Sequence, residues 1–185
     1  MNHAEPHIGE EHHLLLKDGT PVSVLRLSGQ DAERSRLWLR ERINEGYEKL
    51  SSRSRRLRFV SPPHHLAPWQ LDHLSDLDPE RSSIWVARDD GPLQPVGVGL
   101  ARCMRMAELQ DTAEVALTVL DDYQDKGMGR IFLDLMMGYG RKHGLRLLLG
   151  YVLPENAPML HLFARAGARE PIDEGGLLRV ELPLQ

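Results

Sequence analysis

The chain has 185 residues, of which 41% are hydrophobic and only 5% aromatic, and its formal net charge is -4. A chain of this length is expected to form one domain with an aliphatic core. The negative charge argues against a dedicated nucleic-acid-binding protein, which is usually basic. No segment reaches the roughly 20 apolar residues that cross a membrane.

Cys103 is the single cysteine, so an internal disulfide is excluded and a reducing compartment is expected. The N-terminal residues are polar and show no secretory signal. We therefore predict a cytoplasmic protein with no nucleic-acid or membrane partner.

Residues 1–19 are polar and rich in histidine. These histidines, at positions 3, 7, 12 and 13, match no compact set of metal ligands. We expect a flexible polar tail here and no metal site, followed by a single domain over residues 20–185.

The domain is predicted to begin with a strand and a helix. Valine and leucine favour a strand over residues 20–27, and Asp31 is a suitable N-cap for an amphipathic helix over 32–47. The apolar face of this helix would carry Leu37, Ile43 and Tyr47.

A basic stretch, "LSSRSRRLRFVSPPHHL", follows at residues 50–66 and is broken by two prolines. We expect a solvated loop; binding of a phosphate or an acidic partner is the alternative. The next stretch, 67–78, has leucines at helical spacing and Pro68 at a position that suits a helix start.

The second half of the chain alternates strands and helices. The most strongly patterned element is a helix from Met128, whose apolar residues recur at spacings of 3, 4, 7, 8 and 11 and which Gly144 would terminate. The other predicted elements are strands at 83–89, 96–106, 113–120, 145–153 and 177–184 and a helix at 155–167. The crossover within 113–153 predicts a parallel, right-handed unit, and the last strand is expected to run antiparallel.

The segment "QDKGMG" (124–129) joins an apolar strand to this long helix. The first amides of a helix lack internal partners, the helix dipole adds positive charge, and glycine permits close approach, so a phosphate would be well bound there. The segment matches neither the P-loop nor the dinucleotide-binding pattern, and a tight turn is the alternative.

The pattern Q-x-x-G-x-G, formed by Gln124, Gly127 and Gly129, resembles the acyl-CoA-binding motif of the GNAT acetyltransferase superfamily. The stretch "LPENAPMLHLFARAGAR" (153–169) is similar to the segment that follows in that family. The basic stretch from Arg53 onward resembles the bacterial protein-lysine acetyltransferase branch. The resemblance implies a mixed, mostly antiparallel α/β sheet of six to seven strands with helices on both faces and a parallel β-α-β cofactor unit.

The resemblance also implies how acetyl-CoA would be held. The pantetheine arm would add to a splayed strand, and the pyrophosphate would lie on the amides after it. Asn156 would touch the cofactor, with a helix N-cap as its alternative role, and a solvated side chain is the alternative for Lys126. The implied cofactor-binding residues are Leu117, Thr118, Val119, Gln124, Asp125, Lys126, Gly127, Met128, Gly129, Arg130 and Asn156.

Acetyl transfer to an amine requires a base, because the ammonium of a lysine has a pKa of about 10.4. Glu114 resembles the strand glutamate that serves as base in the protein-lysine branch; a surface charge at a strand edge is the alternative, and Glu108 is the reserve candidate. Many GNAT enzymes carry a tyrosine in the last helix to protonate the thiolate. Phe163 occupies that position here, seven residues after Asn156.

The resemblance therefore predicts an N-acetyltransferase that moves an acetyl group from acetyl-CoA to a primary amine, either a protein lysine or a small molecule. The alternative is a non-catalytic acyl-CoA-binding sensor or interaction domain, which the missing tyrosine would allow. The family often forms homodimers, but no residue pattern in this chain selects an interface.

Overall fold

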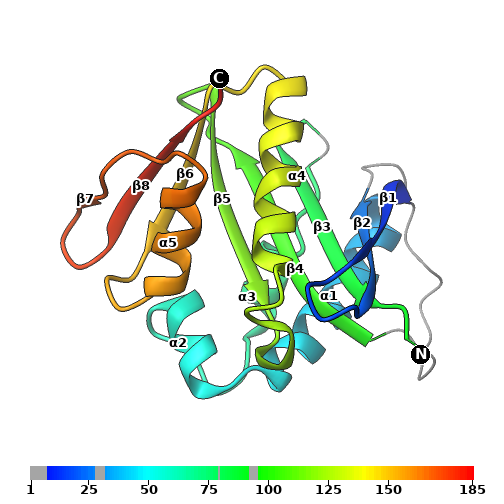
Figure 1. Cartoon of the computed structure of the whole chain (residues 1–185). Helices are drawn as coiled ribbons and strands as arrows, with labels where there is room; N and C mark the ends of the chain where they lie inside the picture. The colour runs from blue at the N-terminus through cyan, green and yellow to red at the C-terminus, as the bar shows by residue number, and fades with distance from the viewer. Residues whose placement is uncertain (1–7, 28–31, 79, 92–95) are drawn as a thin grey trace.

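A computed structural model describes residues 8–27, 32–78, 80–91 and 96–185. Within these residues, eight strands form one sheet in the order β1-β2-β3-β4-β5-β6-β8-β7 (Figure 1). Only the β5–β6 pair is parallel, as the crossover in the sequence predicts. The strands are β1 (Ile8–Leu15), β2 (Pro21–Leu27), β3 (Ser82–Asp89), β4 (Val96–Arg105), β5 (Thr112–Val119), β6 (Leu147–Val152), β7 (Ile172–Asp173) and β8 (Leu178–Pro183).

Helices cover both faces of the sheet, as Figure 1 shows. On one face, α4 (Met128–Lys142) and α5 (Ala157–Arg165) contribute Phe132, Met136 and Phe163 to the larger buried cluster. On the other face, Leu39 of α1 (Ala32–Lys49) joins a smaller cluster with Ile84 and Val86 of β3. The remaining helices are α2 (Ser52–Phe59), α3 (Pro68–Leu74) and a 3-10 turn, η1 (Asp121–Tyr123).

Helix α4 confirms its prediction in detail. It begins after Gly127, which has the left-handed φ of 97°, and its last turn is followed by Gly144 with φ of 75°. The buried side of α4 includes Met128, Phe132, Leu133 and Met136. This helix therefore docks against β4, β5 and β6 and fixes where the glycine segment lies.

Three expectations are corrected by the structure. In α1, Ile43 and Tyr47 lie on the buried side as predicted, but Leu37 is 44% exposed and Leu39 is fully buried in its place. Residues 52–59 form α2 where a loop was expected, since Ser51 caps the helix by accepting a hydrogen bond from the Ser54 amide.

The third correction concerns the N-terminal segment. Residues 8–15 form β1, which pairs antiparallel with β2. Leu14 packs against the larger core cluster and Leu16, directly after the strand, is buried in it, whereas Leu15 and most of the polar residues are exposed. Residues 8–15 are therefore part of the sheet rather than of a tail. The sheet has eight strands where six to seven were expected, β1 and the short β7 having been missed. Asp31, His3 and His7 lie outside the described residues.

Candidate active site

The parallel strands β5 and β6 separate at Glu114. They pair at three positions, the last of which is Glu114 opposite Leu149, although β5 continues to Val119 and β6 to Val152. Beyond this point, β5 keeps its pairing with β4 but has no ladder to β6. Residues 117–119, predicted to bind the pantetheine arm, thus line a free strand edge of the kind that accepts an added strand.

The glycine segment turns sharply from this edge into α4. Asp125 and Gly127 both have positive φ, and the first amide bonded within the helix turn is that of Ile131, which donates to the Gly127 carbonyl at 3.1 Å. The amides of Met128, Gly129 and Arg130 therefore form the helix N-terminus, where partial positive charge gathers. These predicted residues do lie together at the end of β5.

The turn between β1 and β2 holds the glycine segment in place. The Lys17 amide donates to the Lys126 carbonyl at 3.0 Å, and the Lys126 ammonium pairs with Asp18 at 2.9 Å. The hydrogen bond from Lys126 lowers the pKa of Asp18 to about 2. A solvated Lys126, the alternative in the sequence analysis, is therefore replaced by a paired one, and the partner lay in the segment expected to be a tail.

Gln124 lies at the same corner but its side chain points to other protein groups. Its amide nitrogen donates to the Val119 carbonyl at 3.0 Å and to the Ser54 hydroxyl at 3.1 Å. Asp121 accepts bonds from the Ser51 amide and from the hydroxyls of Ser51 and Ser54. The loop after β5 is thus tied to the first turn of α2.

The loop after β6 is tied to the same helix. Glu155 accepts two hydrogen bonds from Arg56, at 3.1 and 2.9 Å, and Asn156 caps α5 by accepting from the Met159 amide at 3.3 Å. The N-cap role for Asn156 is confirmed; contact with a cofactor stays a prediction. Figure 1 shows α2 across the diverging ends of β5 and β6.

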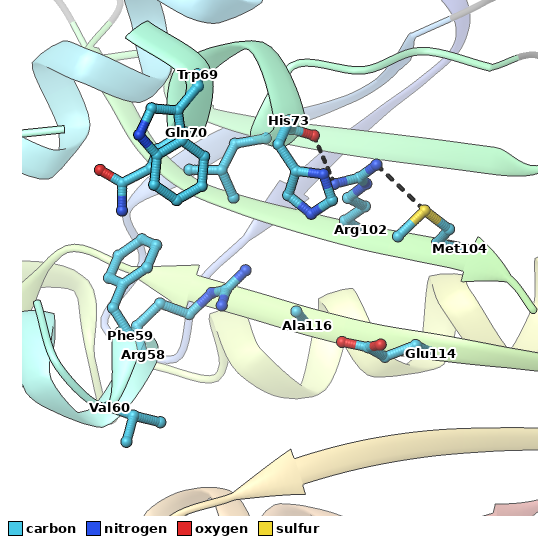
Figure 2. A pocket seen from close by; sticks show the side chains of 11 residues that line it. Arg58, Phe59, Val60, Trp69, Gln70, His73, Arg102, Met104, Glu114 and Ala116 are labelled. Carbon is cyan, nitrogen blue, oxygen red and sulfur yellow. Dashed lines mark hydrogen bonds between the residues drawn. The ribbon is translucent and has the colours of Figure 1, made fainter. Parts of the chain in front are cut away.

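A cavity of about 320 Å³ lies on the face of the sheet that carries Glu114 (Figure 2). Its walls come from the end of α2, from α3 and from neighbouring positions on β4 and β5. Glu114 forms part of its lining, at the point where β5 leaves β6. The lining residues are Arg58, Phe59, Val60, Trp69, Gln70, His73, Leu74, Arg102, Met104, Glu114 and Ala116.

Two arginines dominate the charge of this cavity. Arg102 is only 6% exposed; it donates to the His73 carbonyl at 2.9 Å and to the Met104 sulfur at 3.3 Å. Burial lowers the pKa of Arg102, opposed by the charges of Asp76 and Glu114. Burial also lowers the pKa of Arg58, although part of that side chain reaches solvent, and Glu114 opposes this shift too.

Glu108 and Phe163 lie elsewhere. Glu108 is exposed in the connection between β4 and β5, outside the cavity lining. Phe163 is fully buried, and its ring packs against Gly150 of β6. The placement of Glu114 in the cavity favours it over Glu108 as the candidate base.

The tyrosines at positions 123, 139 and 151 are not among the residues that line the cavity. Tyr123 donates to Asp89 at 2.7 Å, which raises the pKa of Tyr123 to about 12, and Tyr139 stacks on His143. Tyr151 is two residues beyond Leu149, the partner of Glu114, so it shares the sheet face of Glu114. Strand alternation in the sequence could have indicated this position.

Among the residues that the structure describes, no group of three or more histidine, cysteine or acidic side chains is arranged to hold a metal ion. No helix in the same residues is both long and apolar enough to cross a membrane.

Comparison with known proteins agrees with this geometry. The family model described as the acetyltransferase (GNAT) family matches residues 43–168, so the chain belongs to that family. The fold, with its antiparallel sheet and one parallel pair, is the GNAT fold. The expectation of an acetyl-CoA-dependent N-acetyltransferase is confirmed at the level of the family.

Several relatives are similar over most of the chain. Acetyltransferase PA5475 of Pseudomonas aeruginosa is 29% identical over 85% of this chain and 82% of its own length. Acetyltransferase Pat of Mycolicibacterium smegmatis is 30% identical over 77% of this chain, which spans 42% of that longer protein. The crystal structure of the GNAT domain of S. lividans PAT superposes with a TM-score of 0.78 at 27% identity, covering 94% of this chain and 97% of that one.

Proposed function

We propose that this chain transfers the acetyl group of acetyl-CoA to a primary amine bound in the cavity, with Glu114 as the general base. The observation that carries the proposal is the position of Glu114. It is the last β5 residue paired with β6 and also lines the cavity, so it stands between the free strand edge and the space for an acceptor.

Acetyl-CoA would lie on the opposite side of this junction. The pantetheine arm would add to the backbone of Leu117, Thr118 and Val119, and the pyrophosphate would meet the amides from Asp125 to Arg130. A structure with the same fold, yncA from Salmonella typhimurium, was solved with acetyl-CoA; it has a TM-score of 0.62 at 16% identity and covers 89% of this chain and 94% of its own. In this proposal Gln124 acts by holding the end of β5.

The chemistry then needs one proton transfer before bond formation. Glu114 takes a proton from the ammonium of the acceptor, the free amine attacks the thioester carbon, the C–N bond forms and the C–S bond breaks. The nitrogen of the new C–N bond loses its second proton to water as the C–S bond breaks. The coenzyme A thiolate, with a thiol pKa of about 8.5, is an adequate leaving group and receives that proton through water, which leaves the amide and free coenzyme A. Phe163 has no part in this step.

Calorimetric titration with acetyl-CoA tests the proposal, using the wild type, Gly127→Glu and Gly127→Ala. The glutamate would place a negative charge and a side chain at the helix N-terminus, whereas alanine introduces only the strain of a positive φ. We expect saturable binding by the wild type, loss with Gly127→Glu and a smaller effect with Gly127→Ala. No wild-type binding would refute the cofactor site.

Release of coenzyme A with a panel of amines separates an enzyme from the alternative. Binding of acetyl-CoA without transfer to any amine would favour a non-catalytic acyl-CoA-binding domain. A protein lysine and a small amine are both included, because the amine class is a proposal. A cytoplasmic location and a homodimer stay predictions from the sequence.

A further inference from the structure

The lining of the cavity has an excess of positive charge. Arg58 comes from α2 and Arg102 from β4, and Glu114 on β5 is the single acidic residue among those lining the space. In Figure 2 the two guanidinium groups and the carboxylate are arranged around the same space. An acceptor that brings only an ammonium would therefore meet one attractive charge and two repulsive ones.

The two arginines are not equivalent. Arg102 is buried, its terminal nitrogens are bonded to His73 and Met104, and Asp76 lies close enough to balance its charge. Its Nε is buried without a hydrogen-bond partner among the described residues. Arg102 therefore contributes a fixed positive charge to the wall and has little freedom to follow a ligand.

The Arg58 side chain has fewer partners than that of Arg102. The Arg58 side chain makes no hydrogen bond or ion pair with the residues described, and its guanidinium lies 5.0 Å from the centre of the Phe59 ring. The charged groups that act on it are Glu114, which attracts it, and Arg102, which repels it. Because the Arg58 guanidinium has no hydrogen-bond partner among the described residues, its N–H groups are available to a planar anion. A carboxylate fits them well, because its two oxygens can accept two parallel N–H hydrogen bonds.

The rest of the wall is mainly apolar. Phe59, Trp69, Leu74 and Met104 surround the charged groups, and Trp69 is 70% exposed at the cavity. The volume of about 320 Å³ is at the small end of the range of ligand sites, which is about 300 to 1,000 Å³. A compact molecule with an apolar side chain would fill such a space.

We propose that the acceptor is a free α-amino acid with an apolar or aromatic side chain, whose carboxylate binds Arg58 while its amine meets Glu114. This inference rests on the proposed function and names the acceptor class. The carboxylate offsets the excess positive charge of the wall, and the side chain contacts the apolar residues. A protein lysine offers no such anion next to its amine.

The experiment compares amino acids with acceptors that lack a free carboxylate next to the amine. Acetyl transfer is measured with L-phenylalanine, L-leucine and L-methionine, with their carboxamides, and with a lysine peptide blocked at both ends. The protein variants are Arg58→Gln and, as matched control, Arg53→Gln, an exposed arginine on the same helix outside the cavity lining. Because α2 buries none of its residues, both variants should fold.

We expect kcat/KM for the amino acids to exceed that for the amides on the order of tenfold to a hundredfold, the effect of one charge-assisted contact. Arg58→Gln should remove most of this difference without changing the KM for acetyl-CoA, and Arg53→Gln should leave it intact. Amides that react as well as the acids, or a blocked lysine peptide that reacts best, would overturn the inference while leaving the acetyltransferase proposal in place.

A second measurement does not depend on turnover. N-acetyl-L-phenylalanine, the expected product, is titrated into the wild type and into Arg58→Gln in the presence of coenzyme A. Binding that the variant loses supports the carboxylate site even if no amine is acetylated, a result that would count against the proposed function alone. No wild-type binding, or binding that Arg58→Gln leaves unchanged, refutes the site.

Discussion

The Cζ end of the Phe163 ring, on α5, lies against Gly150 of β6. A Cβ built on Gly150 would come within 2.6 Å of the ring Cζ, so the contact requires glycine at 150. Cζ is the atom that carries the hydroxyl of tyrosine. The position that the sequence resemblance matches to a tyrosine of many GNAT enzymes is therefore closely packed here around a phenylalanine ring, and a hydroxyl on Cζ would have to fit into that contact.

We accordingly expect Phe163→Tyr to destabilise the chain by about 1 to 3 kcal/mol and to leave acetyl transfer no faster. Urea unfolding gives the stability, and coenzyme A release gives the rate. Gly150→Ala tests the same contact from the other side and should also lower stability. A Phe163→Tyr variant that is as stable as the wild type and turns over faster would show that the ring can swing toward the thiolate.

Glu114→Gln should lower the rate of acetyl transfer on the order of a hundredfold to ten-thousandfold, because the amide cannot accept the ammonium proton. Acetyl-CoA binding should be unchanged, since the carboxylate lies on the acceptor side of the strand junction. Single-turnover transfer and calorimetry measure the two effects separately. Glu108→Gln, an exposed change nearby on the chain, is the control and should behave as wild type; equal rates in both variants would remove Glu114 as the base.

The strand, glycine segment and helix of the proposed cofactor site could be predicted from the sequence because their signals are local. The periodicity of α4, Gly127 ahead of it and the apolar strand before it all lie within residues 112–142, and the structure places them as expected. The separation of β5 from β6 after Glu114 could not be predicted from these residues, because it depends on where β6 stops pairing with β5.

Most residues around the proposed acceptor cavity were not predicted from the sequence, for physical reasons. Helix α2 buries no residue and is anchored by contacts far along the chain, from Asp121 and Glu155, so its residues show no apolar periodicity. Arg102 lies in a strand that reads as apolar, and only the register with β5, which pairs Arg102 with Ala116 and Met104 with Glu114, puts Arg102 diagonally across from Glu114. The ion pair of Lys126 was not predicted, because its partner, Asp18, belongs to a turn 108 residues earlier.

The anchor between Asp121 and α2 should be sensitive to mutation and to acid. Burial raises the pKa of Asp121, but the hydrogen bonds from Ser51 and Ser54 outweigh it and hold that pKa below its ordinary value of 3.8. The stabilisation is therefore complete above about pH 4 and is lost as the pH falls through the lowered pKa. Protection of the α2 amides from hydrogen exchange should decline over the same range.

Asp121→Asn should reproduce this loosening at neutral pH. Trypsin provides a direct readout, since α2 contains four arginines, and we expect faster cleavage within 52–59 than in the wild type. Because Asp121 is exposed, global stability should fall by less than about 1 kcal/mol. The neighbouring change Asp122→Asn is the control; if both variants are cleaved at the wild-type rate, Asp121 does not hold the helix.

Cys103, 1% exposed in the larger core cluster, should make the protein sensitive to alkali. Burial raises the pKa of its thiol from 9.0 to about 12, so the folded chain keeps a proton that the unfolded chain releases. The stabilisation is complete below pH 9 and declines toward pH 12, by up to about 1.4 kcal/mol per pH unit.

Cys103→Ala should be less stable at neutral pH, by about 1 kcal/mol or more, because of the cavity it leaves. Its stability should nevertheless fall less steeply between pH 9 and pH 11 in urea unfolding, where other titrating groups act equally on both proteins. Parallel declines for the two proteins would show that the thiol titrates in the folded state as it does in the unfolded chain.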